Sequence, residues 1–205
     1  MPPAPKFSRP RLQAAALAIV DEDGLEALSM RSLAAVLGTG PMTLYNYVAD
    51  RDALDALVVE AVMAQARWPE ATEDWRQDVR AIASATWRAL SAHPNAIRLI
   101  LARRDVHETV LAPAEALLGA LARSGRGGGD LLAAFRAVHG YVIGFAQIRL
   151  VGAGAADTLP DRIQALPRER FPKLVEVAAS AAELGPDGEF AAGLEIVLAG
   201  LDRSR

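Results

Sequence analysis

The sequence predicts an all-helical protein with a small N-terminal domain and a larger helical C-terminal domain. Three observations predict this class. The 205 residues are 52% hydrophobic and 23% charged, as in folded globular proteins. Apolar residues recur at helical spacing along the chain, and we find no convincing alternation of the kind that marks a strand. Alanine is abundant and only 5% of residues are aromatic, which favours helices with cores of small aliphatic side chains.

The charge balance and the missing residue types narrow the range of functions. The formal net charge is −3 at pH 7, so the composition gives no sign of nucleic-acid binding. The chain has no cysteine, which excludes disulfides, thiolate zinc sites and a cysteine nucleophile. With only three histidines, we expect no metal and no cofactor. We find no signal peptide and no apolar stretch long enough to span a bilayer, and expect a cytoplasmic protein without a membrane partner.

The first helix is expected at residues 10–23. Gly24 is placed to end it, and one of its faces is expected to hold Leu12, Ala16, Ile19 and Val20. Before it, the proline-rich first five residues are expected to be disordered. Residues 1–11 together form a basic arm with Lys6, Arg9 and Arg11.

Three further helices follow closely. Helix 30–37 repeats apolar residues at helical spacing, with Ser29 as its N-cap. A tight turn at 38–40 leads into helix 41–48, where Pro41 takes the first position and its missing N–H costs nothing. Asp50 then caps a fourth helix, which reaches about residue 67.

The rest of the chain is a larger helical region. We expect helices at 74–92, 95–104, 108–124, 130–151, 171–184 and 188–202, and a loop with one helical turn at 152–170. The domains are therefore placed at 1–50 and 51–205, with helix 50–67 as the connector between them.

Two short helices joined by a glycine-containing turn are typical of a helix-turn-helix unit. In the second of them, Leu44 and Val48 stand four residues apart and face inward. The surface left exposed is expected to hold Met42, Thr43, Tyr45, Asn46 and Tyr47. Phenol, amide and hydroxyl groups suit phosphate contacts and hydrogen bonds to base edges. The pattern alone leaves open ordinary helical packing without any DNA contact.

Residues 11–62 resemble the N-terminal region of the TetR family of bacterial transcription regulators. The resemblance rests on DEDGLEALSMRSLA and on the run Leu37-Gly38-x-x-x-x-Thr43-Leu44-Tyr45-x-Tyr47-Val48, followed by Asp50-Arg51-x-x-Leu54. It implies a three-helix DNA-binding domain and a C-terminal domain for ligand binding and dimerisation. It further implies a repressor that binds a palindromic double-stranded operator as a homodimer and releases it when a small-molecule effector binds.

The resemblance also assigns contacts residue by residue. Arg31 matches a contact to the backbone or a base, and Arg51 falls where members direct a basic residue at phosphate. The full set that we assign to DNA binding is Arg31, Thr39, Pro41, Met42, Thr43, Tyr45, Asn46, Tyr47 and Arg51. Asn46 and Tyr47 differ from the aromatic–histidine pair common in tetracycline-responsive members, so the operator sequence is not carried over.

Two stripes of small residues in the C-terminal half suggest the dimer interface. One lies on helix 130–151 and the other on the last helix; together they comprise Ala133, Ala137, Gly140, Gly144, Ala192, Ile196 and Gly200. Small side chains permit close helix contact, and two such helices from each subunit make a four-helix bundle. From the pattern alone, packing within one subunit is the alternative.

The same half carries apolar side chains that suit a cavity for a small apolar or amphipathic ligand. The candidate lining residues are Trp87, Ile100, Leu117, Phe135, His139 and Val142. An enzyme is the main rival function, but we find no metalloprotease motif, phosphate-binding loop or nucleophile elbow. The third possible function is a helix-turn-helix used only for contact with another protein.

Overall fold

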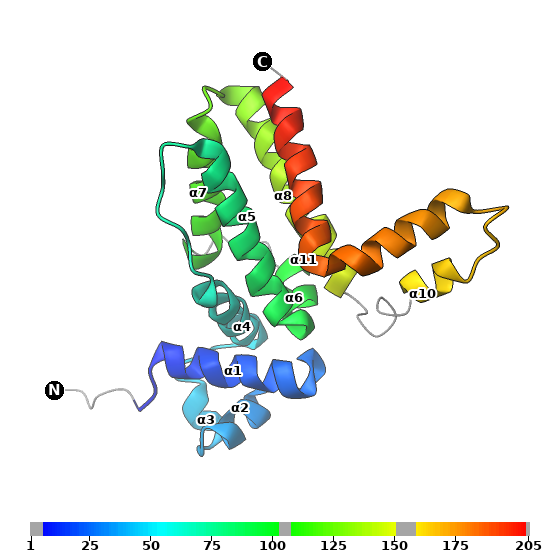
Figure 1. The fold of residues 1–205 in the computed structure, drawn as a ribbon. Coiled ribbons are helices and arrows are strands. Elements are labelled where there is room, and N and C mark those ends of the chain that lie inside the picture. Colours follow the sequence, from blue (N-terminus) through cyan, green and yellow to red (C-terminus); the bar gives the residue numbers. More distant parts are fainter. Residues whose placement is uncertain (1–5, 103–107, 151–158, 204–205) are drawn as a thin grey trace. The chain divides into compact units, whose positions relative to one another are not determined.

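The computed structural model describes residues 6–102, 108–150 and 159–203 (Figure 1). They are all helix, turn or loop, as the sequence predicts. The chain divides into two compact units: Met1–Trp68 with Arg88–Ala114, and Pro69–Trp87 with Glu115–Arg205. The first five residues, for which we expect disorder, lie outside the described part of the chain. The functional boundary at residue 50 stays a prediction.

The first unit contains the N-terminal helices. They are α1 (Arg9–Asp23), η1 (Leu25–Ala27), α2 (Met30–Val36), α3 (Pro41–Leu44) and α4 (Arg51–Gln65), together with the end of α5 (Trp75–Ala92), η2 (Pro94–Ala96) and α6 (Ile97–Ala102). The face of α1 predicted to be buried is buried, and α1 packs along α4. The short 3₁₀ helices η1 and η2 were not expected, because three residues carry no periodic signal.

The ends of these helices agree with the caps expected from the sequence. The hydroxyl of Ser29 accepts a hydrogen bond from the Ser32 backbone N–H, and the hydroxyl of Ser32 in turn accepts one from the Ser29 backbone N–H. Asp50 caps α4 by accepting from the Ala53 N–H at 2.8 Å. Gly38 has φ 63°, a left-handed conformation that explains glycine at the first turn residue. The turn and both flanking helices are therefore determined locally.

His93 joins three helices of the first unit. Its buried ring places Nδ1 2.9 Å from Asp21 Oδ2, in the last turn of α1, and Nε2 3.1 Å from Gln65 Oε1, at the end of α4. Asn95 adds hydrogen bonds to the Val20 and Asp21 carbonyls. The segment after α5 is thus held to the end of α1 by side-chain contacts.

The second unit is built from the first part of α5, α7 (Glu108–Ala122) from Glu115 onward, α8 (Gly128–Leu150), α10 (Leu159–Gln164) and α11 (Pro172–Arg203). The two predicted terminal helices are both present within α11, which is interrupted at Gly185, where the backbone is non-helical with φ 65°, and at Pro186, as the sequence predicts. The half of α11 after the bend packs beside α8, and the half before it pairs with α10 (Figure 1). The helical turn expected within 152–170 is α10.

Side-chain pairs join α5 to α11, and rings join both to α8. Arg76 pairs with Asp202 and Arg80 with Glu195. The Trp87 Nε1–H donates to Asp187 Oδ1 at 2.6 Å. Trp87 lies 5.0 Å from Phe145 and 5.5 Å from Phe190, measured between ring centroids. These contacts make an aromatic cluster in the middle of the second unit.

Helix α8 corrects one expectation from the sequence. We expected no apolar stretch long enough to span a membrane, but Gly128–Leu150 meets the length and composition for one, with a mean hydropathy of 1.4 in its most apolar window. Such a helix is also typical of the interior of a helical bundle. In this structure α8 packs against α11, and its buried face holds Ala134, Val138, Val142 and Ala146.

Candidate nucleic-acid interface

Buried leucine and valine side chains fix the position of α3. Leu33 of α2, together with Leu44 and Val48, is buried almost completely, which confirms the inward face predicted for this segment. Regular α-helix ends at Leu44 rather than at residue 48. The N–H groups of Tyr47 and Val48 both donate to the Leu44 carbonyl, so a further turn follows. The outward residues are therefore held on a rigid support.

The exposed surface over this support has the chemistry of a DNA-reading face. Met42 is 78% exposed and Tyr45 50% exposed, so both side chains are accessible to a partner. Arg31, Pro41 and Asn46 are exposed, whereas Thr39 and Thr43 are half-buried. Their DNA contacts stay a prediction, since no nucleic acid is present.

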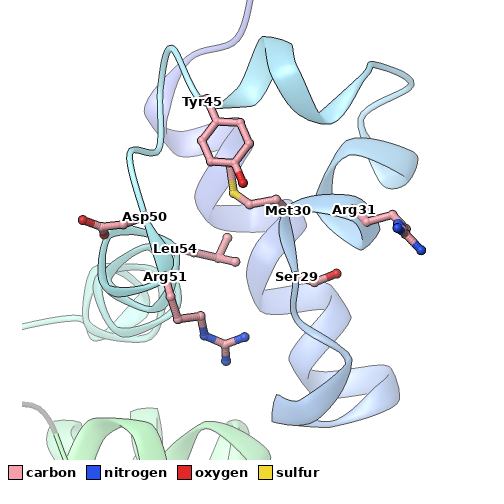
Figure 2. A pocket seen from close by; sticks show the side chains of 7 residues that line it. All are labelled: Ser29, Met30, Arg31, Tyr45, Asp50, Arg51 and Leu54. Carbon is pink, nitrogen blue, oxygen red and sulfur yellow. The ribbon is translucent and has the colours of Figure 1, made fainter.

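A groove of about 570 Å³ opens beside this surface (Figure 2). It is lined by Ser29, Met30, Arg31, Tyr45, Asp50, Arg51 and Leu54. Figure 2 shows Tyr45 and Arg51 toward its two ends, with Met30 and Leu54 between them. The start of α2, the turn after α3 and the start of α4 thus meet at one place.

Tyr47 differs from the exposed position expected for it. It is half-buried and packs edge-on against buried Phe7, with ring centroids 5.8 Å apart. Its hydroxyl accepts a hydrogen bond from the Lys6 backbone N–H at 2.8 Å. The ring therefore anchors the chain that precedes α1, a long-range contact that the spacing within residues 41–48 does not reveal.

The basic arm predicted at residues 1–11 is partly a helix. α1 begins at Arg9, whose guanidinium bonds both Glu60 oxygens at 2.6 and 2.8 Å. Gln13 donates to the same carboxylate at 2.8 Å. These hydrogen bonds raise the pKa of Arg9, despite an opposing effect of burial. Glu60 was missed, although one carboxylate inside the apolar run from Leu57 to Met63 is a signal for a buried pair.

The two stripes proposed for dimerisation lie on the surface of the second unit. Ala133, Ala137 and Gly140 are exposed on α8, where Gly144 is half-exposed, and the α11 positions Ala192, Ile196 and Gly200 are exposed. Ile196 is 72% exposed. A Cβ built at Gly140, Gly144 or Gly200 meets nothing within 4 Å.

The six residues proposed for the ligand cavity are divided between the units. Ile100 lies in the first unit and the other five in the second. Trp87, Leu117 and Val142 are buried, Ile100 and Phe135 are half-buried, and His139 is exposed and stacked on Phe135. Their role in ligand binding stays a prediction. Among the residues that the structure describes, no group of three or more His, Asp or Glu side chains is placed to hold a metal ion.

A helix-turn-helix unit with an exposed reading surface, followed by a larger helical region, defines a DNA-binding regulator. The model of the "Tetracyclin repressor-like, C-terminal domain" family matches residues 68–205. The chain belongs to the TetR family of transcription regulators. Membership in this family makes the protein a transcription regulator. The resemblance to the TetR family that we drew from residues 11–62 is therefore confirmed.

Individual relatives cover nearly the whole chain. The HTH-type transcriptional repressor DrrR1 of Streptomyces coeruleorubidus is 31% identical, covering 98% of this chain and 79% of the repressor. An HTH-type transcriptional regulator of Saccharopolyspora erythraea is 34% identical, covering 78% and 71% respectively. The TetR family protein ActR of Streptomyces coelicolor, in complex with (S)-DNPA, is 30% identical and superposes with a TM-score of 0.80, covering 99% of this chain and 100% of ActR. ActR is also solved with actinorhodin.

Proposed function

We propose that this protein is a cytoplasmic repressor that binds a palindromic operator as a homodimer and releases it on binding a small molecule. The observation that carries the proposal is the exposed surface of residues 42–46. Its side chains are held in place by Leu44, which points inward and is fully buried. A surface of this kind is stable without a partner yet has apolar and polar groups for base edges. The naming of DrrR1 as a repressor favours repression over activation.

Local charge supports DNA binding although the net charge is −3. Arg31 lines the groove, and Lys6 and Arg11 lie before and within the first turn of α1. The acidic residues Asp21, Glu22 and Asp23 stand at the other end of the same helix. Binding to DNA phosphates depends on the cations near the contact, not on the charge of the whole chain.

Dimerisation supplies the second half of the operator contact. A single helix-turn-helix reads few base pairs, so two are placed on half-sites roughly 34 Å apart. The exposed small-residue stripes of α8 and α11 suit two-fold packing of two helices from each subunit, because short side chains allow close helix contact. Burial of exposed Ile196 at such an interface removes apolar surface from water.

We further propose a planar aromatic effector. Rings from α5, α8 and α11, namely Trp87, Tyr141, Phe145 and Phe190, pack with centroids 5.0–5.9 Å apart. Burial raises the pKa of Tyr141, whose phenol donates a hydrogen bond to the Phe190 carbonyl at 2.8 Å. Flat aromatic molecules stack on such rings in the same geometries that the rings adopt with one another. The binding of actinorhodin by ActR supports this class.

A mobility-shift assay with the DNA flanking the gene tests operator binding. The wild-type chain is expected to shift a palindromic fragment at low salt, while Tyr45→Ala and Thr43→Ala abolish the specific shift. Both variants should keep the dimer and nearly the wild-type Tm. Gln77→Ala, at an exposed position of α5 in the second unit, is the matched control and should bind normally. The absence of any shift by the wild-type chain would contradict the proposal.

Actinorhodin is the probe for the effector class. Added to the shifted complex, it is expected to release the DNA and to raise the Tm of the free protein, because a ligand that binds only the folded state stabilises it. If neither change occurs while the operator still shifts, the proposed effector class is wrong and the DNA-binding function stands.

A further inference from the structure

Arg51, at the first position of α4, is bonded inward rather than extended toward solvent. Its Nη1 donates to the Leu28 carbonyl at 2.6 Å, and its Nε lies 2.8 Å from Asp55 Oδ1 one turn further along α4. The side chain is 52% exposed, and Asp55 only 14%. One guanidinium thus connects the residue that follows η1 to the start of α4.

The geometry of these two contacts requires arginine. A guanidinium is planar and offers donors along separate edges, so it can bond a carbonyl and a carboxylate in two directions at once. A lysine ammonium carries the same charge but only one nitrogen. Substitution by lysine therefore preserves the attraction to DNA phosphates while losing the simultaneous contacts to Leu28 and Asp55.

The link spans the part of the protein that positions the reading surface. Leu28 is fully buried and immediately precedes Ser29, the N-cap of α2. α4 begins just after Val48, the inward residue that follows α3. Arg51 therefore connects the start of α4 to the residue just before α2. It does so beside the groove that Tyr45 also lines (Figure 2).

We infer that Arg51 is a positioning residue that clamps α2 and α3 to α4 and so holds the reading surface in place. This inference rests on the proposed function, because it requires that the reading surface binds an operator. It reassigns the position that the family resemblance directs at phosphate. A guanidinium already paired with Asp55 adds little net charge to a DNA contact, and freeing it breaks the ion pair with Asp55 and the hydrogen bond to the Leu28 carbonyl.

Four variants separate a clamp from a phosphate contact. Arg51→Lys keeps the positive charge but loses the branched guanidinium group, and Arg51→Ala loses both. Asp55→Asn removes the negative partner of Nε and keeps the shape of the side chain. Asp52→Asn is the matched control, since it removes the same charge from an exposed position in the first turn of α4. For each variant, the affinity for the operator fragment and for a scrambled duplex is measured between low and moderate salt.

The clamp predicts that Arg51→Lys and Arg51→Ala both bind the operator about tenfold or more weakly, as expected for loss of charge-assisted hydrogen bonds. The slope of log affinity against log salt stays unchanged, as does binding to the scrambled duplex. Asp55→Asn also weakens operator binding, although loss of an acid near DNA otherwise strengthens it. Asp52→Asn binds as tightly as the wild-type chain or more tightly.

A phosphate contact predicts the opposite pattern. Arg51→Lys would keep the operator affinity, while Arg51→Ala would weaken both duplexes alike and lower the number of released counterions by about one. Either result overturns the inference. Circular dichroism at the assay temperature shows whether Arg51→Ala is folded; if it is not, Arg51→Lys and Asp55→Asn decide alone. Failure of the wild-type chain to bind any duplex would instead reject the proposed function.

Discussion

Removal of Arg9 is expected to destabilise the protein more than neutralisation of its partner Glu60. The Glu60 carboxylate is 2% exposed, whereas Arg9 is 53% exposed. Arg9→Ala therefore removes the cation that pairs with a buried carboxylate, to which Gln13 Nε2 still donates at 2.8 Å. Glu60→Gln instead leaves an arginine that water can hydrate.

The burial of each partner sets the expected magnitude. Loss of one partner from a fully buried ion pair costs about 3–5 kcal/mol. Because the Arg9 side of this pair faces water, we expect about 2–3 kcal/mol for Arg9→Ala, and about 1 kcal/mol for Glu60→Gln, which keeps the shape of the side chain. For a chain of this size, each kcal/mol corresponds to roughly 2–4 °C in Tm.

Thermal unfolding followed by circular dichroism at one protein concentration measures the difference. Arg11→Ala is the control, because it removes the same positive charge only two residues from Arg9. The Arg11 guanidinium lies over the Phe7 ring, 5.3 Å from its centroid. Arg9→Ala should lower the Tm by about 4–12 °C and Arg11→Ala by much less. If Arg9→Ala is no more destabilising than Glu60→Gln, then leaving the buried carboxylate without its arginine does not cost more than leaving the arginine without its carboxylate, and the reasoning is wrong.

Three other substitutions probe the fold and the assembly. Gly144→Leu places a large side chain in the proposed dimer stripe and should weaken self-association at least about tenfold; an unchanged dimer by sedimentation velocity would place the interface elsewhere. Gly193→Ala brings a Cβ into collision with the Tyr141 hydroxyl and with the ring carbons beside it, so we expect thermal unfolding to show a loss of about 1–3 kcal/mol in unfolding free energy. His93→Leu removes the ring contacts to Asp21 and Gln65 and should cost about 1–3 kcal/mol; a Tm equal to that of the wild-type chain would show that these contacts do not stabilise the first unit.

The helices and their caps could be predicted because their causes are local. Ser29, Pro41 and Asp50 each act within a few residues of their own position, and the spacing of Leu44 and Val48 defines an inward face without knowledge of what covers it. Most predicted helices agree with the structure within a few residues of their ends. Helix 41–48 ended early, since backbone bonds to one carbonyl replace its last regular turn.

The roles of individual polar side chains were harder to predict. Tyr47, Arg9 and Arg51 all fall on a surface that the sequence pattern assigns to DNA, yet each bonds to a residue distant in sequence or outside its own helix. Tyr47 anchors Lys6, Arg9 anchors Glu60, and Arg51 anchors the Leu28 carbonyl. Periodicity predicts which face a residue occupies, but a long side chain can turn from that face to any acceptor within reach.

The sequence by itself determined the helical class, the order of the helices, the turn between α2 and α3, and the family, because these depend on short-range spacing and on a specific motif. Only the tertiary structure decided how the basic residues near the reading surface are used. Buried carboxylates and carbonyls such as Glu60 and Leu28 are costly to leave unpaired, and the nearest cation binds them. Which cation lies nearest to such a group depends on how α1, α2 and α4 pack together. A local sequence pattern does not predict these distances.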